Sequence, residues 1–246
     1  MVTETDYGID QLMEDGKRIF ADRPYNAVCF GYPSPVANHE ASNNYLSTKS
    51  QKGIYPLMLI TRDKMTYAQI EESIVEGGFF GFKVILPWIG NDYGNVRIQD
   101  MIGPTEMNMA NNLGLVVLIH VPRSGRLADP EIQREVREYA RRYPNASIVL
   151  AHCGRCYHPD VMKVAVEAIR DLDNVYVDTA MVMDPVVFQI LFREIDSRRV
   201  LYGTDFPVAT MRGRRVYVMN HWVDVVTEGY PVSSFRAISS DMNVTF

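Results

Sequence analysis

The chain has 246 residues, 47% of them hydrophobic, and its 25 Lys and Arg against 30 Asp and Glu give a formal charge of −5. This length and composition predict one domain, residues 1–246, with one large core and no nucleic-acid-binding surface, because no long run of Lys or Arg occurs. No apolar stretch reaches the roughly 18 residues of a membrane span, and the acidic start is unlike a signal peptide, so we expect a cytoplasmic protein.

The first predicted element is a helix, which precedes any recognisable strand. Its apolar face consists of Ile9, Leu12, Met13 and Phe20. Seven short apolar runs follow at intervals of about 25–35 residues, the length of one strand-plus-helix unit. They begin near Asn26, Ile54, Phe80, Leu115, Ser147, Asn174 and Arg199. Near-continuous Val, Ile and Leu without a polar face is typical of parallel strands that helices cover on both sides.

Helical patterns lie between these runs and have recognisable first residues. Thr66 precedes the amphipathic segment YAQIEESIVEG. Asp129-Pro130 and Asp184-Pro185 each place a capping carboxylate before a proline at the first helical position. We therefore expect one helix after each of these three signals.

Three other segments have less regular patterns. Residues 32–52 are rich in Ser, Asn and Pro without a clear period, and they predict a long loop of the kind that often carries substrate contacts. The segment VYVMNHWVDVV, residues 216–226, predicts a helix in which His221 is structural. The cluster MRGRR, residues 211–215, is interpreted as a solvated loop rather than a clamp for an anionic substrate.

The alternation of strands and helices predicts an α/β protein with a parallel sheet. The size and spacing of the units point to a (β/α)8 TIM-barrel-like fold. Seven strands, and a leading helix with no strand before it, suggest an incomplete barrel that lacks the first strand and is short at the C-terminus. We therefore expect the chain to be a fragment of a longer barrel.

Several predicted strands end in residues that bind metals or transfer protons. These are Lys83 in GFKVILP, His120 in LVVLIHVP, His152 in SIVLAHCG, Asp178 in NVYVDTA and Asp205 in VLYGTDFP. The carboxyl ends of barrel strands meet at one mouth, where active sites lie, so these side chains are expected to be neighbours. For Asp178 a turn-capping role is an equally good interpretation.

The succession GFKVILP, LVVLIHVP, IVLAHCGR, NVYVDTA and VLYGTDFP resembles the amidohydrolase 2 branch of the metal-dependent amidohydrolase superfamily, over Ile54 to Pro207. The resemblance implies a divalent metal, zinc or alternatively manganese, with His120 and Asp205 as ligands. It also implies that His152 is catalytic by polarising substrate or moving a proton, and that Asp205 is catalytic by deprotonating a metal-bound water. The implied reaction is hydrolysis of an amide, ester or lactone in a small molecule.

One family feature is absent from this sequence. The resemblance implies a His-x-His pair at the end of the first strand, but the five histidines stand at positions 39, 120, 152, 158 and 221. Catalytic zinc usually takes three protein ligands, so the metal site could be unoccupied in this chain. Three alternatives stay open: a metal-free lactonase, a non-catalytic barrel or fragment, and a metal-dependent, non-oxidative decarboxylase of an aromatic or unsaturated acid.

Cationic side chains near the predicted site suggest an anionic substrate. Arg123 and Arg155 closely follow two of the strand-end histidines and are predicted to bind a carboxylate in the bidentate manner of guanidinium groups. Arg126 is a further candidate, with solvated loop arginines as the alternative for all three. Lys83 is predicted to contact substrate or to pack in the core. The expected partner is a small molecule, and the chain could form a homo-oligomer.

The three cysteines do not predict a disulfide framework. Cys153 and Cys156 form a C-x-x-C, but a structural zinc site would need a second ligand pair at longer spacing, and a redox motif a different context. We interpret both as small buried thiols. His158 precedes Pro159 and is expected at the start of a helix.

Overall fold

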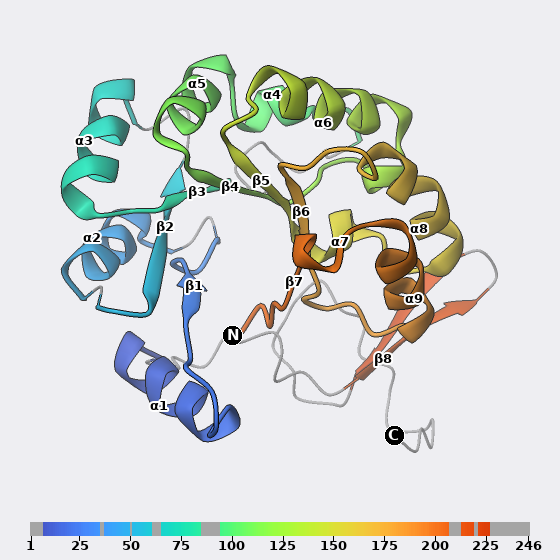
Figure 1. Ribbon diagram of the computed structural model, residues 1–246, viewed down its shortest axis with the longest axis horizontal. Helices are drawn as coiled ribbons and strands as arrows, with labels where there is room; N and C mark the ends of the chain where they lie inside the picture. Colours follow the sequence, from blue (N-terminus) through green and yellow to red (C-terminus); the bar gives the residue numbers. More distant parts are fainter. Residues whose placement is uncertain are drawn as a thin grey trace.

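Seven parallel strands form one curved sheet whose strand order follows the chain (Figure 1). They are β1 (Ala27–Cys29), β2 (Ile54–Ile60), β3 (Gly81–Val84), β4 (Val116–Ile119), β5 (Ser147–Leu150), β6 (Val175–Asp178) and β7 (Val200–Leu201). The computed structural model describes residues 7–34, 37–49, 51–60, 65–84 and 94–206, and the backbone of 213–218 and 221–226. Within these residues β1 and β7 each pair on one side only. The sheet is an open half-barrel, which confirms the expected TIM-barrel-like, incomplete α/β fold.

Most of the helices line the convex side of this sheet (Figure 1). The helices are α1 (Ile9–Ile19), α2 (His39–Lys49), α3 (Tyr67–Gly77), α4 (Ile98–Met101), α5 (Pro104–Leu113), α6 (Pro130–Arg142), α7 (Ala151–Arg155), α8 (Pro159–Ala165) and α9 (Pro185–Glu194). None of the described helices has the length and apolar character needed to cross a bilayer.

The predicted helix starts are confirmed. Thr66 and Gln69 form a capping box at the start of α3. The side chains of Asp129 and Asp184 accept hydrogen bonds from backbone N–H groups two residues later, with a proline at the first helical position of α6 and α9. His158 is the N-cap of α8, as expected. Local signals were sufficient to predict these helix starts, because capping side chains accept hydrogen bonds from first-turn N–H groups that have no partner within the helix.

One secondary-structure prediction is wrong at residues 32–52, where a long loop was expected. This segment contains helix α2. The buried amide of Asn43 donates to the carbonyl oxygen of Leu59 and accepts from its N–H, both at 3.0 Å. Helix α2 is therefore stabilised by contacts with β2, which the modest helix propensity of its Ser and Asn residues did not reveal.

A second prediction is wrong at residues 216–226, where a helix was expected. The backbone forms an antiparallel pair, β8 (Gly213–Val218) and β9 (His221–Val226). Valine and aromatic residues favour strands, and this preference outweighs the helical period of the segment. The side chains of the MRGRR cluster and of His221 lie outside the described part of the chain.

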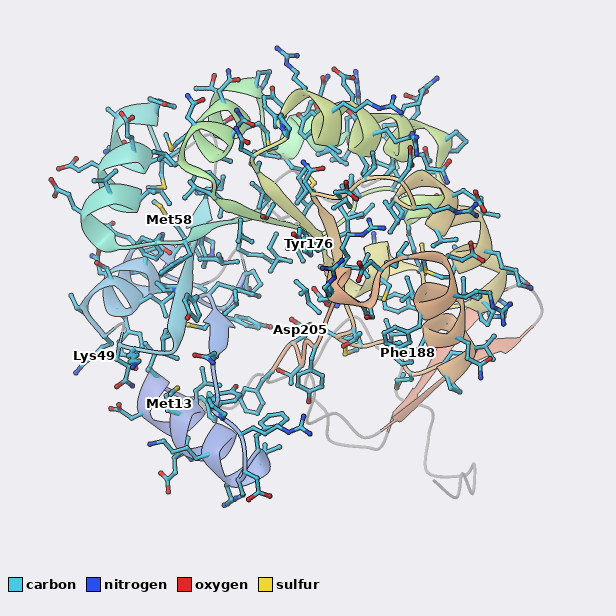
Figure 2. All side chains as sticks on the ribbon, viewed as in Figure 1. Met13, Lys49, Met58, Tyr176, Phe188 and Asp205 are labelled. Atoms are coloured by element: carbon cyan, nitrogen blue, oxygen red, sulfur yellow. The ribbon has the colours of Figure 1, made fainter. Side chains whose placement is uncertain are left out.

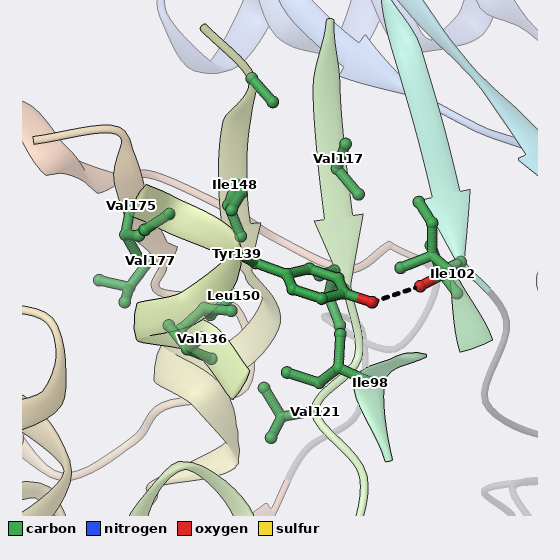
Figure 3. Close-up of a cluster of buried hydrophobic side chains, with 14 of the residues drawn as sticks. Ile98, Ile102, Val117, Val121, Val136, Tyr139, Ile148, Leu150, Val175 and Val177 are labelled. Carbon is green, nitrogen blue, oxygen red and sulfur yellow. Dashed lines mark hydrogen bonds between the residues drawn. The ribbon is translucent and has the colours of Figure 1, made fainter. Parts of the chain in front are cut away.

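Alternate residues of the strands face opposite sides of the sheet. One set packs against the helices in the main core: Phe82, Val84, Val117, Ile119, Ile148, Leu150, Val175 and Val177. Figure 3 shows part of this layer, in which Tyr139 of α6 donates a hydrogen bond of 2.8 Å to the carbonyl oxygen of Ile102. The opposite set forms a smaller group on the concave side, here called the concave cluster: Leu57, Leu118, Val149 and Ala151.

Arg199 directly precedes β7, and its side chain binds the segment that leads into β6. Its side chain is buried, and its guanidinium donates to four carbonyl groups at 2.7–3.2 Å: those of Ile169, Arg170, Leu172 and Val175. A buried charge is tolerated only when such acceptors surround it.

Replacement of Arg199 by Met should lower the free energy of unfolding by about 3 kcal/mol or more, because several buried carbonyl groups lose their donor. Urea unfolding followed by circular dichroism measures this loss. Arg198→Met is the matched control, since the Arg198 side chain is 88% exposed and pairs with Asp196 at the surface. The control should keep the wild-type midpoint, and equal losses in the two variants would contradict the role given to Arg199.

Candidate functional site

A row of side chains in register crosses the concave face. Lys83 pairs with Leu59 on one side and with Leu118 on the other. Leu118 pairs with Val149, which in turn pairs with Tyr176. Because these residues share a register and a face, Lys83 is the one charged member of an otherwise largely apolar floor.

Polar side chains follow this floor at the carboxyl ends of four strands: His120 after β4, His152 after β5, Asp178 in β6 and Asp205 after β7. The His120 and His152 rings meet edge to face, with centroids 5.3 Å apart and an interplanar angle of 77°. The Oδ2 atom of Asp205 lies 4.0 Å from Nε2 of His152. Figure 2 shows Asp205 toward the middle of the arc of strands. The structure thus brings the predicted strand-end residues together.

The backbone is strained along the same edge of the sheet. Every described non-glycine residue with positive φ follows one of the strands β4 to β7: Arg123, Arg126, His152, Cys153, Arg155, Met181 and Asp205. The element α7 is a left-handed turn, with φ of 56°, 53° and 64° at residues 152–154. Each left-handed residue other than glycine costs roughly 1–2 kcal/mol. Such strain gathers at sites where side-chain position matters more than stability.

His152 is held by the segment that follows β6. Its N–H donates to Oδ1 of Asp178 at 2.9 Å, and its Nδ1 lies 3.2 Å from the carbonyl oxygen of Ala180. A carbonyl oxygen only accepts, so Nδ1 carries the proton in this hydrogen bond and Nε2 keeps its lone pair in the neutral ring. Burial lowers the pKa of His152, although Asp178 and Asp205 oppose this effect. The ring can therefore act as a base through Nε2.

The neighbours of His152 also have shifted pKa values. Burial raises the pKa of Asp178, although the charge of His152 opposes the shift. Burial lowers the pKa of His120 well below its usual range, and the nearby charges of Lys83 and Arg155 act in the same direction. Two imidazoles are thus kept neutral beside a carboxyl group that holds its proton more readily than usual.

These residues do not by themselves fit the metal that the resemblance implies. The buried Nδ1 of His120 has no hydrogen-bond partner among the described residues, which is what we would expect of an atom that binds a metal. Within the same residues, however, no three His, Cys, Asp or Glu side chains gather in a way that could hold a metal ion. Catalytic zinc takes three protein ligands, and His120 with Asp205 would supply two.

The arginines predicted to bind substrate tie loops together. Arg123 donates to the carbonyl oxygen of Val96 at 3.2 Å and to the carboxylate of Asp129 at 3.3 Å. Arg155 donates to the carbonyl oxygen of Val121 at 2.9 Å. Part of each guanidinium is therefore engaged within the protein, and substrate binding by the remaining donors stays a prediction. Substrate binding by Lys83 also stays a prediction.

Two aromatic residues border the site and were not predicted. The Nζ atom of Lys83 lies 5.3 Å from the centroid of the Phe30 ring. The Tyr157 and His152 ring centroids are 6.4 Å apart. Phe30 directly follows β1, so the strand-end rule that identified the other residues could have found it. Tyr157 follows the left-handed turn, for which the sequence has no signal.

Cys153 and Cys156 are buried free thiols, as interpreted from the sequence. Cys153 donates a hydrogen bond of 3.2 Å to the carbonyl oxygen of Asp178. Burial raises the pKa of both thiols, that of Cys156 to about 12. Thiolate formation, which metal binding and redox exchange require, is therefore disfavoured at both positions.

The lowered pKa of His120 predicts a loss of stability in acid. An unfolded histidine titrates near pH 6.5, so below about pH 7 the unfolded chain binds a proton that the folded chain does not. The free energy of unfolding should then fall as the pH falls from about 7 to 5. His120→Asn should flatten this slope in urea unfolding at a series of pH values. An unchanged slope would show that His120 titrates normally in the folded protein.

Known proteins are similar to this chain in sequence and in fold. The amidohydrolase family model matches residues 38–223. No curated protein sequence matches the chain. The 4-oxalomesaconate hydratase of Rhodopseudomonas palustris is 16% identical, with a TM-score of 0.57, over 83% of this chain and 69% of that one. An amidohydrolase 2 of Bifidobacterium longum subsp. infantis is 15% identical, with a TM-score of 0.56, over 83% and 74%.

A third solved structure, the 5-carboxyvanillate decarboxylase of Sphingomonas paucimobilis, is 14% identical, with a TM-score of 0.51, over 81% of this chain and 73% of that one. At such identities the structural likeness shows the fold alone. The family match is stronger, because it spans more than half of the chain and includes Lys83, His120, His152, Asp178 and Asp205. The chain belongs to the amidohydrolase 2 branch of the amidohydrolase superfamily.

Proposed function

We propose that this protein is a hydrolase that cleaves an amide, ester or lactone bond in a small, anionic molecule at the carboxyl edge of the half-barrel. The observation that carries the proposal is the setting of His152. Its Nδ1 is bound to a backbone carbonyl, and its Nε2 faces Asp205 across 4.0 Å. An imidazole fixed in one tautomer, with its free nitrogen toward a carboxylate, is suited to general base catalysis.

The reaction proceeds through the residues of the chain as follows. Water attacks the substrate carbonyl carbon while its proton passes to Nε2 of His152, and the carbonyl electron pair moves to oxygen. The tetrahedral intermediate then expels the amine or alcohol, which takes the proton from Nε2. Asp205 stabilises the imidazolium that forms in between, and Asp178 holds the His152 backbone in its left-handed conformation through the 2.9 Å hydrogen bond.

Amidohydrolases generally depend on a metal, and here zinc, with manganese as the alternative, stays a prediction. Because the described residues supply the pair His120 and Asp205 but no third ligand, no step above uses the metal. If a metal binds, His120 and Asp205 would hold it, and it would lower the pKa of a bound water.

Decarboxylation of an aromatic or unsaturated acid is the second candidate. The specific observation in its favour is Asp178, whose pKa is raised by burial and which lies 4.0 Å from Nδ1 of His152. Non-oxidative decarboxylation needs an acid that protonates the carbon from which CO2 departs, and a carboxyl group with a raised pKa is better suited to this role than an ordinary aspartate. Release of CO2 from a carboxylic acid substrate separates this candidate from hydrolysis.

His152→Asn should lower kcat by about 100-fold or more, because the general base is lost. Asparagine tolerates the left-handed backbone at this position, so the variant should fold. The assay uses a panel of carboxylate-bearing lactones, esters and amides, with product analysis. His158→Asn is the matched control: asparagine is a good N-cap, which suits the position of His158 at the start of α8. Wild-type turnover in His152→Asn would rule out the proposed base.

Metal content is a separate prediction. After incubation with zinc or manganese and dialysis, the protein should retain less than one equivalent, because two protein ligands hold a metal weakly. Elemental analysis by mass spectrometry measures the content. One tightly bound equivalent that is lost in both His120→Ala and Asp205→Ala would contradict this expectation. It would also show that residues outside the described part complete the ligand set.

A further inference from the structure

The mechanism proposed above leaves the amine of Lys83 without a role. Lys83 lies in β3 between Phe82 and Val84, which are both packed in the main core against the helices. By the alternation of the strand, its own side chain faces the concave side. There it is 5% exposed and lies in register with Leu59 and Leu118. The aliphatic part of the side chain is thus enclosed by apolar neighbours.

The Nζ atom of Lys83 has no hydrogen bond or ion pair with any residue in the part of the chain that the structure describes. Its recorded contact is the face of Phe30, with 5.3 Å between Nζ and the ring centroid. A lysine that serves only to stabilise a core normally meets a carboxylate or carbonyl acceptor, because an unpaired buried charge is costly. Among the described residues Lys83 has no such acceptor at hydrogen-bond distance, so packing alone does not account for a buried amine at this position.

Four titratable side chains surround this amine at longer range. Asp178 and Asp205 attract its charge. The positive charge of Lys83 in turn lowers the pKa values of His120 and His152. Burial nevertheless outweighs both carboxylates and lowers the pKa of Lys83. The group is therefore better suited to react as a neutral amine than to bind an anion as an ammonium ion.

We propose that Lys83 is a nucleophilic amine that captures a small aldehyde or ketone as a Schiff base in the concave site. The geometry meets the two needs of such a reaction. The amine lies over the Phe30 ring, and Lys83 is in register with Leu118 of the concave cluster. Its charge interacts with those of Asp178, Asp205, His120 and His152, which can donate and accept protons. A desolvated lysine in an apolar setting is an activated nucleophile.

The reaction balances without a further reagent. The lone pair of Nζ forms a bond to the carbonyl carbon, and the carbonyl electron pair moves to oxygen. The neutral His152 takes a proton from the nitrogen and passes it to this oxygen, which gives the carbinolamine. His152 then takes the second proton of the nitrogen and passes it to the hydroxyl group, which leaves as water while the nitrogen lone pair forms the C=N bond. The products are the Schiff base and one water molecule.

This activity goes beyond the proposed hydrolysis and does not depend on it. Hydrolysis uses Nε2 of His152 and a water molecule, whereas carbonyl capture uses Nζ of Lys83. A protein that hydrolyses esters but fails to capture an aldehyde would overturn only the present proposal. A protein that captures an aldehyde but hydrolyses nothing would overturn only the previous one.

The test is reductive trapping with glyoxylate, a small aldehyde that carries a carboxylate. The full chain is incubated with glyoxylate and sodium cyanoborohydride at pH 7, and the modified lysines are located and timed by peptide mass spectrometry. Lys49, exposed at the end of α2 (Figure 2), is the internal reference. We expect Lys83 to be modified at least severalfold faster than Lys49, because its lowered pKa leaves a larger fraction of the amine neutral at pH 7.

Two controls keep the result specific. In urea the two lysines should react at similar rates, because the difference arises from folding. Lys83→Met should remove the fast-reacting equivalent while the rate at Lys49 is unchanged, and its circular dichroism spectrum reports whether it folds. Modification of Lys83 no faster than Lys49 in the folded wild-type protein would overturn the proposal, whether the amine is protonated or inaccessible.

Discussion

The parallel register of the seven strands is the constraint on which the rest of the structure depends. Each strand presents alternate residues to the helices and to the concave face, so a one-residue shift would exchange the two sets. With the observed pairing, Val and Ile side chains meet the helices. Lys83 lies on the opposite face, where its charge interacts with those of His120, Asp178 and Asp205. The site is therefore a product of the same pairing that buries the core.

Burial of this polar edge accounts for its electrostatic character. The concave cluster excludes water from beneath Lys83, and the charged forms of the buried groups lose solvation. The pKa values of His120, His152 and Lys83 fall and that of Asp178 rises for the same reason. Because the groups interact, each also depends on the protonation of its neighbours. Several groups that favour their neutral forms thus lie within one region of the molecule.

The left-handed turn after β5 shows how the fold supports this arrangement. Left-handed residues are costly, yet His152, Cys153 and Arg155 adopt the conformation in succession around Gly154. The hydrogen bonds from His152 to Asp178 and from Cys153 to the Asp178 carbonyl hold the turn. The large apolar core behind the sheet stabilises the fold and so offsets the energetic cost of this turn. The orientation of His152 is thus maintained by its neighbours in space.

The sequence by itself determined the seven parallel strands and the helices α1, α3, α6, α8 and α9, and it pointed to the candidate site residues. Apolar runs, the caps at Thr66, Asp129 and Asp184, and polar residues at strand ends are local signals. Only the tertiary structure decided what depends on distant partners: α2 through Asn43 and Leu59, the engagement of Arg123 and Arg155, and Phe30 beside Lys83. A pKa shift or a ligand set likewise depends on which side chains meet in space, and strand pairing rather than local sequence fixes that.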